Sequence, residues 1–459
     1  MQTLNALPSS YRDNDGFVFE HDALFYRLIR PSYFPHYDLL NESGLYRELT
    51  EAGRLIRHEE VVPGTVSFTC PSGCKVILPE QLPFTSYPYE WSFDMWRDAA
   101  IVTLKIAMQS MEKGMLLKDA TPFNIQFVHG RPMFIDTLSF EAYDEHKPWI
   151  AYHQFCACFL GPLLIMQYNH AELGRLFLLY PEGIPLSVVK NILPARAKLN
   201  LQVYLHIWLQ ASVSKKSRPG KKSAIAPFSR QKLQSVLKSL LLLVTNTKAK
   251  EGKTTWDDYY TGTILGSQYL QVKTKLVDQF TGNMSFDTVI DLGANDGHFS
   301  LLLQERAKYI IATDADVKCI NALYQHVRLK KIKNILPIIN VLNLPSPAIG
   351  WNNAERVDMT RRLKADLVLV LALIHHLVIS ANIPLELIAG WLSNMAPQLL
   401  IEFVPKSDEK VMQLLQHRED IFPEYNLSAF KNVFSQYFTV EAEEKIGETE
   451  RVLFLMKRR

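Results

Sequence analysis

The second half of the chain is constrained most strongly by a regular alternation of short apolar runs and amphipathic stretches. The amphipathic stretches have helical spacing, and the apolar runs are rich in Val, Ile and Leu. Runs that are apolar throughout predict strands buried on both faces, and their alternation with helices predicts a mostly parallel, doubly wound α/β sheet. We expect seven strands, the last two forming an antiparallel pair, at 286–291, 309–314, 335–341, 366–371, 399–404, 437–442 and 452–456.

A basic segment divides the chain into two parts. Between Ala211 and Lys250 there are ten Lys and Arg residues and no Asp or Glu, together with Pro, Gly and Ser. Such a composition is typical of a solvated linker, with a patch for an anionic partner as the alternative. We therefore predict an N-terminal α+β domain at 1–210, a basic linker at 211–255 and the doubly wound domain at 256–459.

Composition and charge exclude several classes of protein. The 459 residues include 50 Lys and Arg against 47 Asp and Glu, and this net charge of +3 is too small to indicate nucleic acid as a partner. The longest apolar runs, at 155–166 and 240–244, fall short of the roughly 20 residues that cross a bilayer. The first residues have neither the basic start nor the apolar core of a signal peptide. We expect a cytoplasmic protein.

The strongest local motif lies where the first of these strands meets a helix. Asp291 ends the strand, and Gly293, Asn295 and Gly297 follow in the turn. In an open α/β sheet, ligands bind beyond the carboxyl ends of the strands, and glycine lets the backbone approach a ligand closely. The Gly-x-x-x-Gly spacing is not that of dinucleotide folds, and Asp291 would repel a pyrophosphate. The motif favours a ligand with a cationic amino or sulfonium group.

A second acidic residue ends the next strand. Asp314 follows Gly293 by 21 residues, a place from which a carboxylate accepts both hydrogen bonds of a ribose diol. Together the two acids and two glycines predict a nucleoside site without a pyrophosphate. The alternative is a glycine turn beside two solvated carboxylates.

With this acid-x-Gly-x-x-x-Gly motif, residues 256–459 resemble class I S-adenosylmethionine-dependent methyltransferases. The resemblance implies a Rossmann-like fold, S-adenosylmethionine as cofactor and methyl transfer to an O or N nucleophile. It places Asp291 near the methionine moiety, with Gly293 and Gly297 beside it, and Asp314 on the ribose. The third strand ends without an acid, so Asn340 is the candidate for the adenine, and Ala372 offers backbone to the adenosyl group.

Two further residues at strand ends are candidates for catalysis. His375, favoured over His376, follows the fourth strand and would deprotonate the nucleophile, although such a pair is equally often a polar cap. Glu402, at the end of the fifth strand, is the second candidate. Methyl transfer to a good nucleophile needs mainly proximity and orientation, so neither role is required by the chemistry.

The N-terminal region carries a different pattern. Asp119-x4-Asn124, followed by Asp136, resembles the catalytic and metal-binding loops of protein-kinase-like phosphotransferases. The resemblance implies that Asp119 is the base and that Asn124 and Asp136 hold Mg²⁺ with ATP. The sequence departs from it, because no Gly-rich phosphate loop is present and only Arg27 or Lys75 replaces the usual lysine. An α+β domain with polar turn caps is the alternative.

The stretches ALIHHL, IEFVPKSD and GETERVLFLM resemble a group of two-part bacterial proteins labelled methyltransferases, some of them nodulation-related. We expect a two-domain enzyme whose N-terminal domain recognises a methyl acceptor, either a small molecule, a glycan precursor or a protein. Nucleic acid is disfavoured, although the run from Lys215 to Lys222 keeps it open. The rivals are a bifunctional methyltransferase and phosphotransferase, and a non-enzymatic interaction protein with two degenerate folds.

Overall fold

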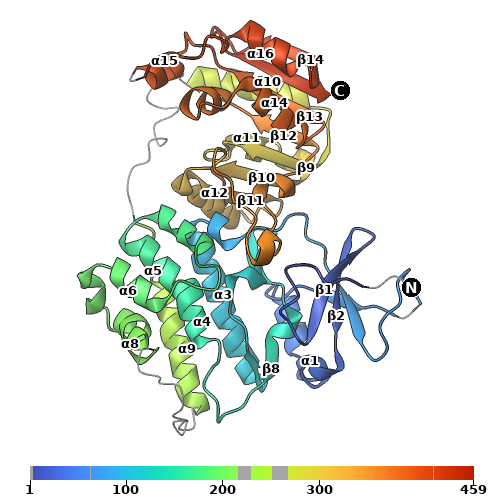
Figure 1. The fold of residues 1–459 in the computed structure, drawn as a ribbon, viewed down its shortest axis with the longest axis vertical. Coiled ribbons are helices and arrows are strands. Elements are labelled where there is room, and N and C mark those ends of the chain that lie inside the picture. The colour runs from blue at the N-terminus through green and yellow to red at the C-terminus, as the bar shows by residue number, and fades with distance from the viewer. Residues whose placement is uncertain (1–3, 63, 215–228, 251–266, 417) are drawn as a thin grey trace. The chain divides into compact units, whose positions relative to one another are not determined.

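The computed structural model describes residues 4–62, 64–214, 229–250, 267–416 and 418–459 (Figure 1). Contacts divide the chain into two compact units. The N-terminal unit comprises Met1–Glu251 together with Ala348–Val357, and the C-terminal unit comprises Gly252–Pro347 and Asp358–Arg459. In the described part of the chain, no helix has both the length and the apolar character needed to cross a bilayer.

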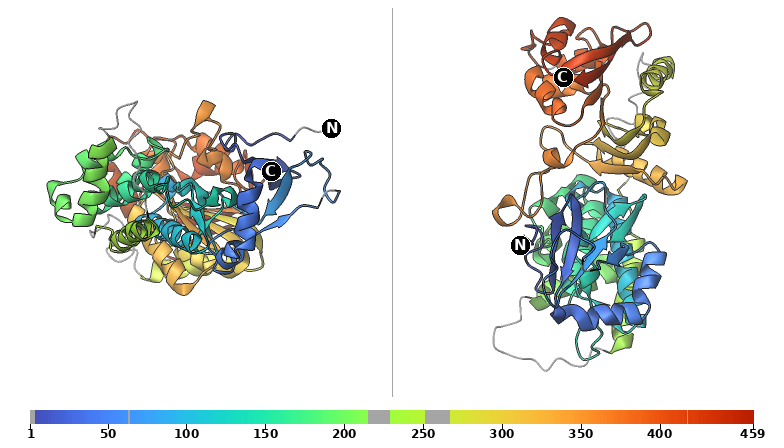
Figure 2. Two further views of the ribbon diagram at one scale, coloured as in Figure 1. Left: turned by 90° about the horizontal axis from the view of Figure 1, so that it is seen from below. Right: turned by 90° about the vertical axis from the view of Figure 1, so that its right-hand side faces the viewer.

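The N-terminal unit begins with an antiparallel sheet, whose strands are coloured blue in the right-hand view of Figure 2. Its strand order is β1-β2-β4-β3, and two helices, α1 (Phe34–Glu42) and α2 (Leu45–Glu51), follow β2. The strands are β1 (Gly16–His21), β2 (Leu24–Ile29), β3 (His58–Glu60) and β4 (Lys75–Pro79). Phe19, Leu28 and Val76 form an apolar cluster on this sheet.

The rest of the N-terminal unit is mainly helical and is built around α3 (Phe93–Glu112), most of whose residues are buried. Two small antiparallel two-stranded sheets follow it, formed by β5 (Met115–Leu117) with β8 (Phe140–Ala142) and by β6 (Ile125–Val128) with β7 (Arg131–Phe134). The later helices are α4 (Tyr152–Phe155), α5 (Gly161–Tyr168), α6 (Leu186–Ile192), α7 (Leu201–Val203), α8 (Gln210–Ser214) and α9 (Arg230–Thr245).

The segment 211–255 differs from the expected linker where it is described. Leu233, Leu237 and Leu240 of α9 recur at helical spacing and are fully buried, and α9 packs against α3 within the N-terminal unit. This apolar stripe makes the helix part of a core in spite of the surrounding basic residues. Residues 215–228 and 251–255 of the segment lie outside the described residues.

The C-terminal unit contains the expected seven-stranded sheet, in the order β11-β10-β9-β12-β13-β15-β14. β15 is antiparallel to both of its neighbours, and the other pairings are parallel. The strands are β9 (Phe286–Leu292), β10 (Ala307–Asp314), β11 (Ile335–Ile339), β12 (Leu367–Val370), β13 (Gln398–Phe403), β14 (Phe438–Lys445) and β15 (Val452–Arg458). The prediction of a mostly parallel α/β sheet closed by an antiparallel pair is confirmed.

Helices connect these strands, and the path of the chain fixes where a ligand can bind. From β9 the chain adds β10 and β11 on one side and later β12 and β13 on the other. In open α/β sheets ligands bind beyond the carboxyl ends of the strands at the point where the strand order reverses, which here lies between β9 and β12. The helices are α10 (Ser267–Thr281), α11 (His298–Leu302), α12 (Val317–Lys330), α13 (Met359–Arg362), α14 (Leu385–Ser393), α15 (Glu409–Leu415) and α16 (Leu427–Phe434).

Residues 348–357, between β11 and α13, belong to the N-terminal unit. There the Val357 amide donates a 3.0 Å hydrogen bond to the Tyr87 hydroxyl, and Arg12 forms a 2.8 Å ion pair with Glu355. These residues lie within the range predicted for the C-terminal domain, because nothing in the local sequence pattern marks a segment that packs elsewhere.

Candidate functional site

The first predicted site residue, Asp291, lies near the carboxyl end of the central strand β9. It is 2% exposed, and the Ser300 hydroxyl of α11 donates a 2.7 Å hydrogen bond to its Oδ2. Burial raises the pKa of Asp291 to about 6, and Asp314 adds to the effect while Ser300 and Lys273 oppose it. Because this buried carboxylate is poorly solvated, a positively charged group nearby would stabilise its ionised form.

The turn after β9 needs its glycines. Gly293 and Gly297 have φ values of 74° and 84°, in the left-handed region where side chains are disfavoured. A Cβ at Gly297 would clash with the Leu323 side chain of α12. Asn295 also has a positive φ, of 50°, as asparagine tolerates better than most residues. The turn is therefore tightly specified by sequence.

Asp314 joins this turn to the end of β10. Its Oδ2 accepts a 2.9 Å hydrogen bond from the Asn295 amide, and its Oδ1 accepts a 2.8 Å bond from the Asp316 amide. Burial raises its pKa against the effect of these amide donors. Each carboxylate oxygen has a second acceptor site, so Asp314 can hold the turn and still accept two hydrogen bonds from a ligand.

Asn340, just after β11, is the residue that most clearly lacks a partner. Its backbone amide donates a 2.8 Å hydrogen bond to the Asp314 carbonyl, and the residue is 3% exposed. Among the described residues, nothing pairs with its side-chain Oδ1 or Nδ2. A buried unpaired polar group costs about 1–3 kcal/mol. The amide therefore fits a ligand edge that offers one donor and one acceptor.

After β12 the backbone is strained at Ala372 and the side chain of His375 is buried. Ala372 has a φ of 53°, a conformation that costs a non-glycine residue on the order of 1–3 kcal/mol and is often found at functional sites. His375 is fully buried, and within the described part of the chain neither of its ring nitrogens has a partner. Burial, reinforced by the charges of Arg451 and Lys273, lowers its pKa well below the usual value. The imidazole is therefore neutral at pH 7 and able to accept a hydrogen bond.

Glu402, the second catalytic candidate, is occupied by an ion network. It lies 2.6 Å from the Lys273 ammonium and 3.2 Å from the Arg451 guanidinium, and the Tyr269 hydroxyl donates to it at 2.6 Å. Burial alone would raise its pKa, but Lys273 and Arg451 outweigh burial and hold the pKa below its usual value. An ionised carboxylate with three partners is better suited to fixing its neighbours than to taking a proton.

The partners of Glu402 were not predicted from the sequence. Tyr269 and Lys273 lie one turn apart on α10, and Arg451 precedes β15 and pairs through two nitrogens with Asp408 at 2.7 and 2.9 Å. These residues are distant in sequence and carry no local motif. Only the four-residue spacing of Tyr269 and Lys273, which predicts a shared helix face, was a detectable signal.

In the N-terminal unit, the structure brings Asp119 and Asn124 together. The Asn124 side-chain amide donates to Asp119 Oδ2 at 3.2 Å, and the Gln154 amide donates to Oδ1 at 2.7 Å. Burial raises the pKa of Asp119, and the charge of Asp136 acts in the same direction. Both oxygens of this carboxylate already have protein donors.

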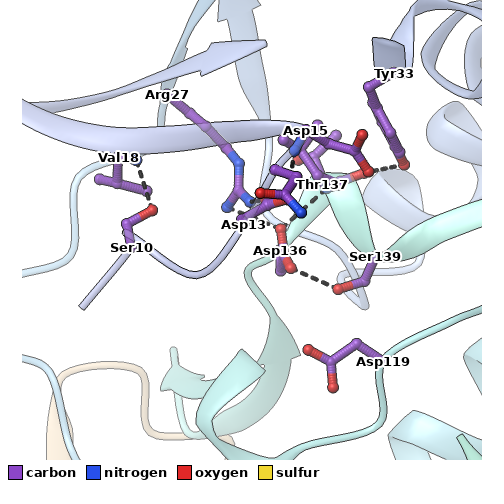
Figure 3. A network of polar contacts seen from close by, with 12 residues as sticks. Ser10, Asp13, Asp15, Val18, Arg27, Tyr33, Asp119, Asp136, Thr137 and Ser139 are labelled. Carbon is purple, nitrogen blue, oxygen red and sulfur yellow. Dashed lines mark hydrogen bonds and ion pairs between the residues drawn. The ribbon is translucent and has the colours of Figure 1, made fainter. Parts of the chain in front are cut away.

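Asp136 lies in the neighbouring polar network drawn in Figure 3. Its Oδ1 forms a 2.8 Å ion pair with Arg27 of β2, and its Oδ2 accepts a 2.5 Å hydrogen bond from the Ser139 hydroxyl. Of the two cations considered from sequence, Arg27 reaches this site, whereas Lys75 pairs with Asp38 at 3.3 Å.

The expected magnesium site has little support. Among the residues that the structure describes, no group of three or more His, Cys, Asp or Glu side chains is arranged to hold a metal ion. Asn124 and Asp136 make hydrogen bonds and an ion pair within the protein. A kinase-like assignment of the N-terminal unit thus has no support beyond the spacing in sequence and the proximity of these residues.

Comparison with known proteins identifies one full-length relative. No family model matches the chain. Over 459 residues it is 31% identical to the nodulation protein NoeA of Rhizobium meliloti (strain 1021), covering 98% of this chain and 95% of that protein.

Solved structures with partial similarity cover less than half of the chain. The PH0226 protein of Pyrococcus horikoshii OT3 is 14% identical, with a TM-score of 0.32, over 45% of this chain and 100% of that chain. The N-methyltransferase NodS of Bradyrhizobium japonicum WM9 is 8% identical, with a TM-score of 0.31, over 42% and 97%. Magnesium protoporphyrin IX methyltransferase (ChlM) of Synechocystis PCC 6803, with bound SAH, is 14% identical, with a TM-score of 0.30, over 46% and 90%. Likeness at this level says nothing by itself about activity.

Proposed function

The chain belongs to the family of nodulation protein NoeA, and we propose that its C-terminal unit is an S-adenosylmethionine-dependent methyltransferase acting on an oxygen or nitrogen nucleophile. The observation that carries the proposal is the set formed by Asp291, Asp314 and the unpartnered amide of Asn340. These residues end or follow three adjacent strands, next to the point where the strand order reverses.

Each of these groups fits one part of an adenosyl ligand. Asp314 would accept hydrogen bonds from the two ribose hydroxyls, and the amide of Asn340 would pair with the amino group and a ring nitrogen of adenine. Asp291 would face the positive charge of the methionine end. When bound, S-adenosylmethionine supplies a methyl group activated by its sulfonium.

A dinucleotide fits this site less well. Asp291 and Asp314 would both repel a pyrophosphate, and the amides of Gly293 and Ala294 already donate to the Thr313 carbonyl at 2.8 and 2.9 Å. Those amides are therefore not available to bind phosphate oxygens, as they would be in a phosphate-binding loop. The chemistry of the site favours a nucleoside with a cationic tail.

His375 and Glu402 are assigned different roles in this proposal. The neutral ring of His375 would orient the nucleophile by accepting a hydrogen bond from it, and its lowered pKa makes it a weak final acceptor for the proton. Glu402 would hold Lys273 and Arg451 in place and would not itself react. The methyl acceptor, recognised by the N-terminal unit, is a small molecule, a glycan precursor or a protein.

Calorimetric titration of the full-length protein with S-adenosylhomocysteine tests the proposal. We expect the wild type to bind, and we expect Asp314→Ala to weaken binding by at least about tenfold, since two hydrogen bonds to a charged acceptor are lost. Asp287→Ala is the matched control, because the carboxylate of this exposed aspartate at the opposite end of the strand β9 pairs only with Lys308 among the described residues. If the wild type fails to bind S-adenosylhomocysteine at millimolar concentration, the proposal of a methyltransferase is refuted. The non-enzymatic interaction protein then remains as the alternative.

A second candidate function concerns the N-terminal unit. The Asp119–Asn124 contact and the Arg27–Asp136 ion pair are the observations behind phosphoryl transfer as a weaker candidate, since no metal-holding cluster is found among the described residues. It predicts magnesium-dependent ATP binding that disappears in Asp136→Ala. Absence of nucleotide binding by the wild type in calorimetry would eliminate it.

A further inference from the structure

A helical segment of the N-terminal unit has apolar residues on two opposite faces. α7, a π-helical turn (Tyr204–Leu209) and α8 follow one another without a break. Val203, Ile207 and Ala211 recur every four residues and are buried, and this inner face lies toward α6 and α9. Burial of the inner face explains why the segment is helical and how it is held on the unit.

The opposite face of the same segment is exposed. Leu201, Leu205 and Leu209, also four residues apart, are 68%, 39% and 42% exposed. Tyr204 lies beside them at 44%, and Leu199, just before α7, is 88% exposed. Single exposed leucines are ordinary, but a continuous stripe of this kind marks an interaction surface. We call these five residues the leucine face.

The sequence on both sides of the leucine face is basic. From Gly183 to Lys250 the sequence has 13 Lys and Arg residues and no Asp or Glu, whereas the other 391 residues have 37 Lys and Arg against 47 Asp and Glu. Arg196 and Lys198, immediately before Leu199, are exposed. Neither forms an ion pair with any residue that the structure describes, and the Lys198 ammonium lies 5.9 Å from the centre of the Trp208 ring.

We propose that the leucine face docks this protein on a membrane surface that contains anionic lipids. A helix with exposed apolar side chains and a basic border lies in the plane of such a surface, with its leucines at the boundary between headgroups and acyl chains. The basic residues of this stretch, which has no Asp or Glu over 68 positions, are complementary in charge to lipid phosphates. They would gain no electrostatic attraction from an uncharged apolar surface. The binding is peripheral and does not depend on the methyltransferase assignment.

Co-sedimentation of the full-length protein with lipid vesicles tests this proposal. We expect the protein to bind vesicles that contain about one third phosphatidylglycerol, to bind phosphatidylcholine alone far less, and to be released as salt is raised. Leu201→Ser/Leu205→Ser should lower the partition coefficient by at least about tenfold. Arg196→Gln/Lys198→Gln should lower it several-fold and flatten the dependence on salt.

Leu179→Ser/Leu329→Ser is the matched control, because these two leucines are 71% and 79% exposed and lie outside the leucine face. It should bind vesicles like the wild type. Since all the substituted side chains are at the surface, thermal unfolding and S-adenosylhomocysteine binding should be the same in every variant, which separates loss of docking from loss of fold or of the proposed activity.

Four results would overturn the proposal. The first is absence of binding, or equal binding to neutral and anionic vesicles. The second is a Leu201→Ser/Leu205→Ser variant that binds no more weakly than the control. The third is a dimer in light scattering that this variant dissociates, which would make a second copy of the chain the occupant. The fourth is oligonucleotide binding that depends on Arg196 and Lys198 but not on the leucines.

Discussion

The two polar clusters of this protein differ in how far the chain satisfies its own hydrogen bonds. In the N-terminal unit, both oxygens of Asp119 and of Asp136 are paired with protein donors. In the C-terminal unit, the buried side chains of Asn340 and His375 have no partner among the described residues. A satisfied network stabilises a fold, whereas buried unpaired groups need an explanation such as a ligand. The contrast makes the C-terminal cluster the stronger candidate for binding.

The largest expected effect is on the buried ion network of the C-terminal unit. Glu402→Ala leaves Lys273 without its buried counter-charge and leaves Arg451 with Asp408 alone, which should lower the free energy of unfolding by about 3–5 kcal/mol. Glu48→Ala, which breaks the partly exposed Glu48–Lys113 pair of the N-terminal unit, should cost at most about 1 kcal/mol. Urea unfolding measures both, and equal effects would show that the network is not buried as described.

The second effect is a pH dependence that comes from Asp291. Its pKa is raised from 3.8 to about 6 in the folded protein, so the unfolded chain ionises first. The contribution of Asp291 to stability is therefore largest below pH 4, and about 3 kcal/mol of it is lost as the pH rises through 6. Asp291→Asn should remove this loss in urea unfolding between pH 4 and 7. A difference in stability between wild type and Asp291→Asn that stays constant from pH 4 to 7 would contradict the assignment.

The third prediction compares the loss of stability on replacing two glycines with positive φ. Gly297→Ala combines backbone strain with a clash against Leu323 and should destabilise by about 2 kcal/mol or more. Gly114→Ala in the N-terminal unit has a similar φ of 75° but open space around the new Cβ, so it should cost only about 1 kcal/mol. Thermal unfolding measures the difference, and S-adenosylhomocysteine binding should be lost only in Gly297→Ala.

The smallest effect on stability is the most diagnostic for function. Asn340→Ala removes a buried amide that has no partner, so stability should stay the same or rise by up to about 1 kcal/mol. Its affinity for S-adenosylhomocysteine should fall by roughly tenfold, because two ligand hydrogen bonds are lost. Asn124→Ala in the N-terminal unit should instead lower stability and leave this affinity unchanged. A loss of stability in Asn340→Ala would mean that the amide has a structural role.

Much of the C-terminal unit could be predicted from local sequence. Strand positions follow from apolar runs, and the turn at Gly293 and Gly297 follows from a conformation that only glycine adopts easily. Because parallel strands present their carboxyl ends at one edge, the proximity of Asp291, Asp314 and Asn340 also followed from their places at strand ends. The N-terminal unit was less predictable, since its short strands and irregular helices leave weak periodic patterns.

The sequence by itself determined the elements and the turn, because these depend on residues within a few positions of one another. Only the tertiary structure decided which polar groups stay unpaired and which are neutralised. Glu402 ends its strand as expected, but Lys273 and Arg451, far away in the chain, occupy its carboxylate. The helix α9 likewise joins a core despite its basic surroundings. Such pairings depend on which surfaces meet when the elements pack, and no local pattern of residues specifies that.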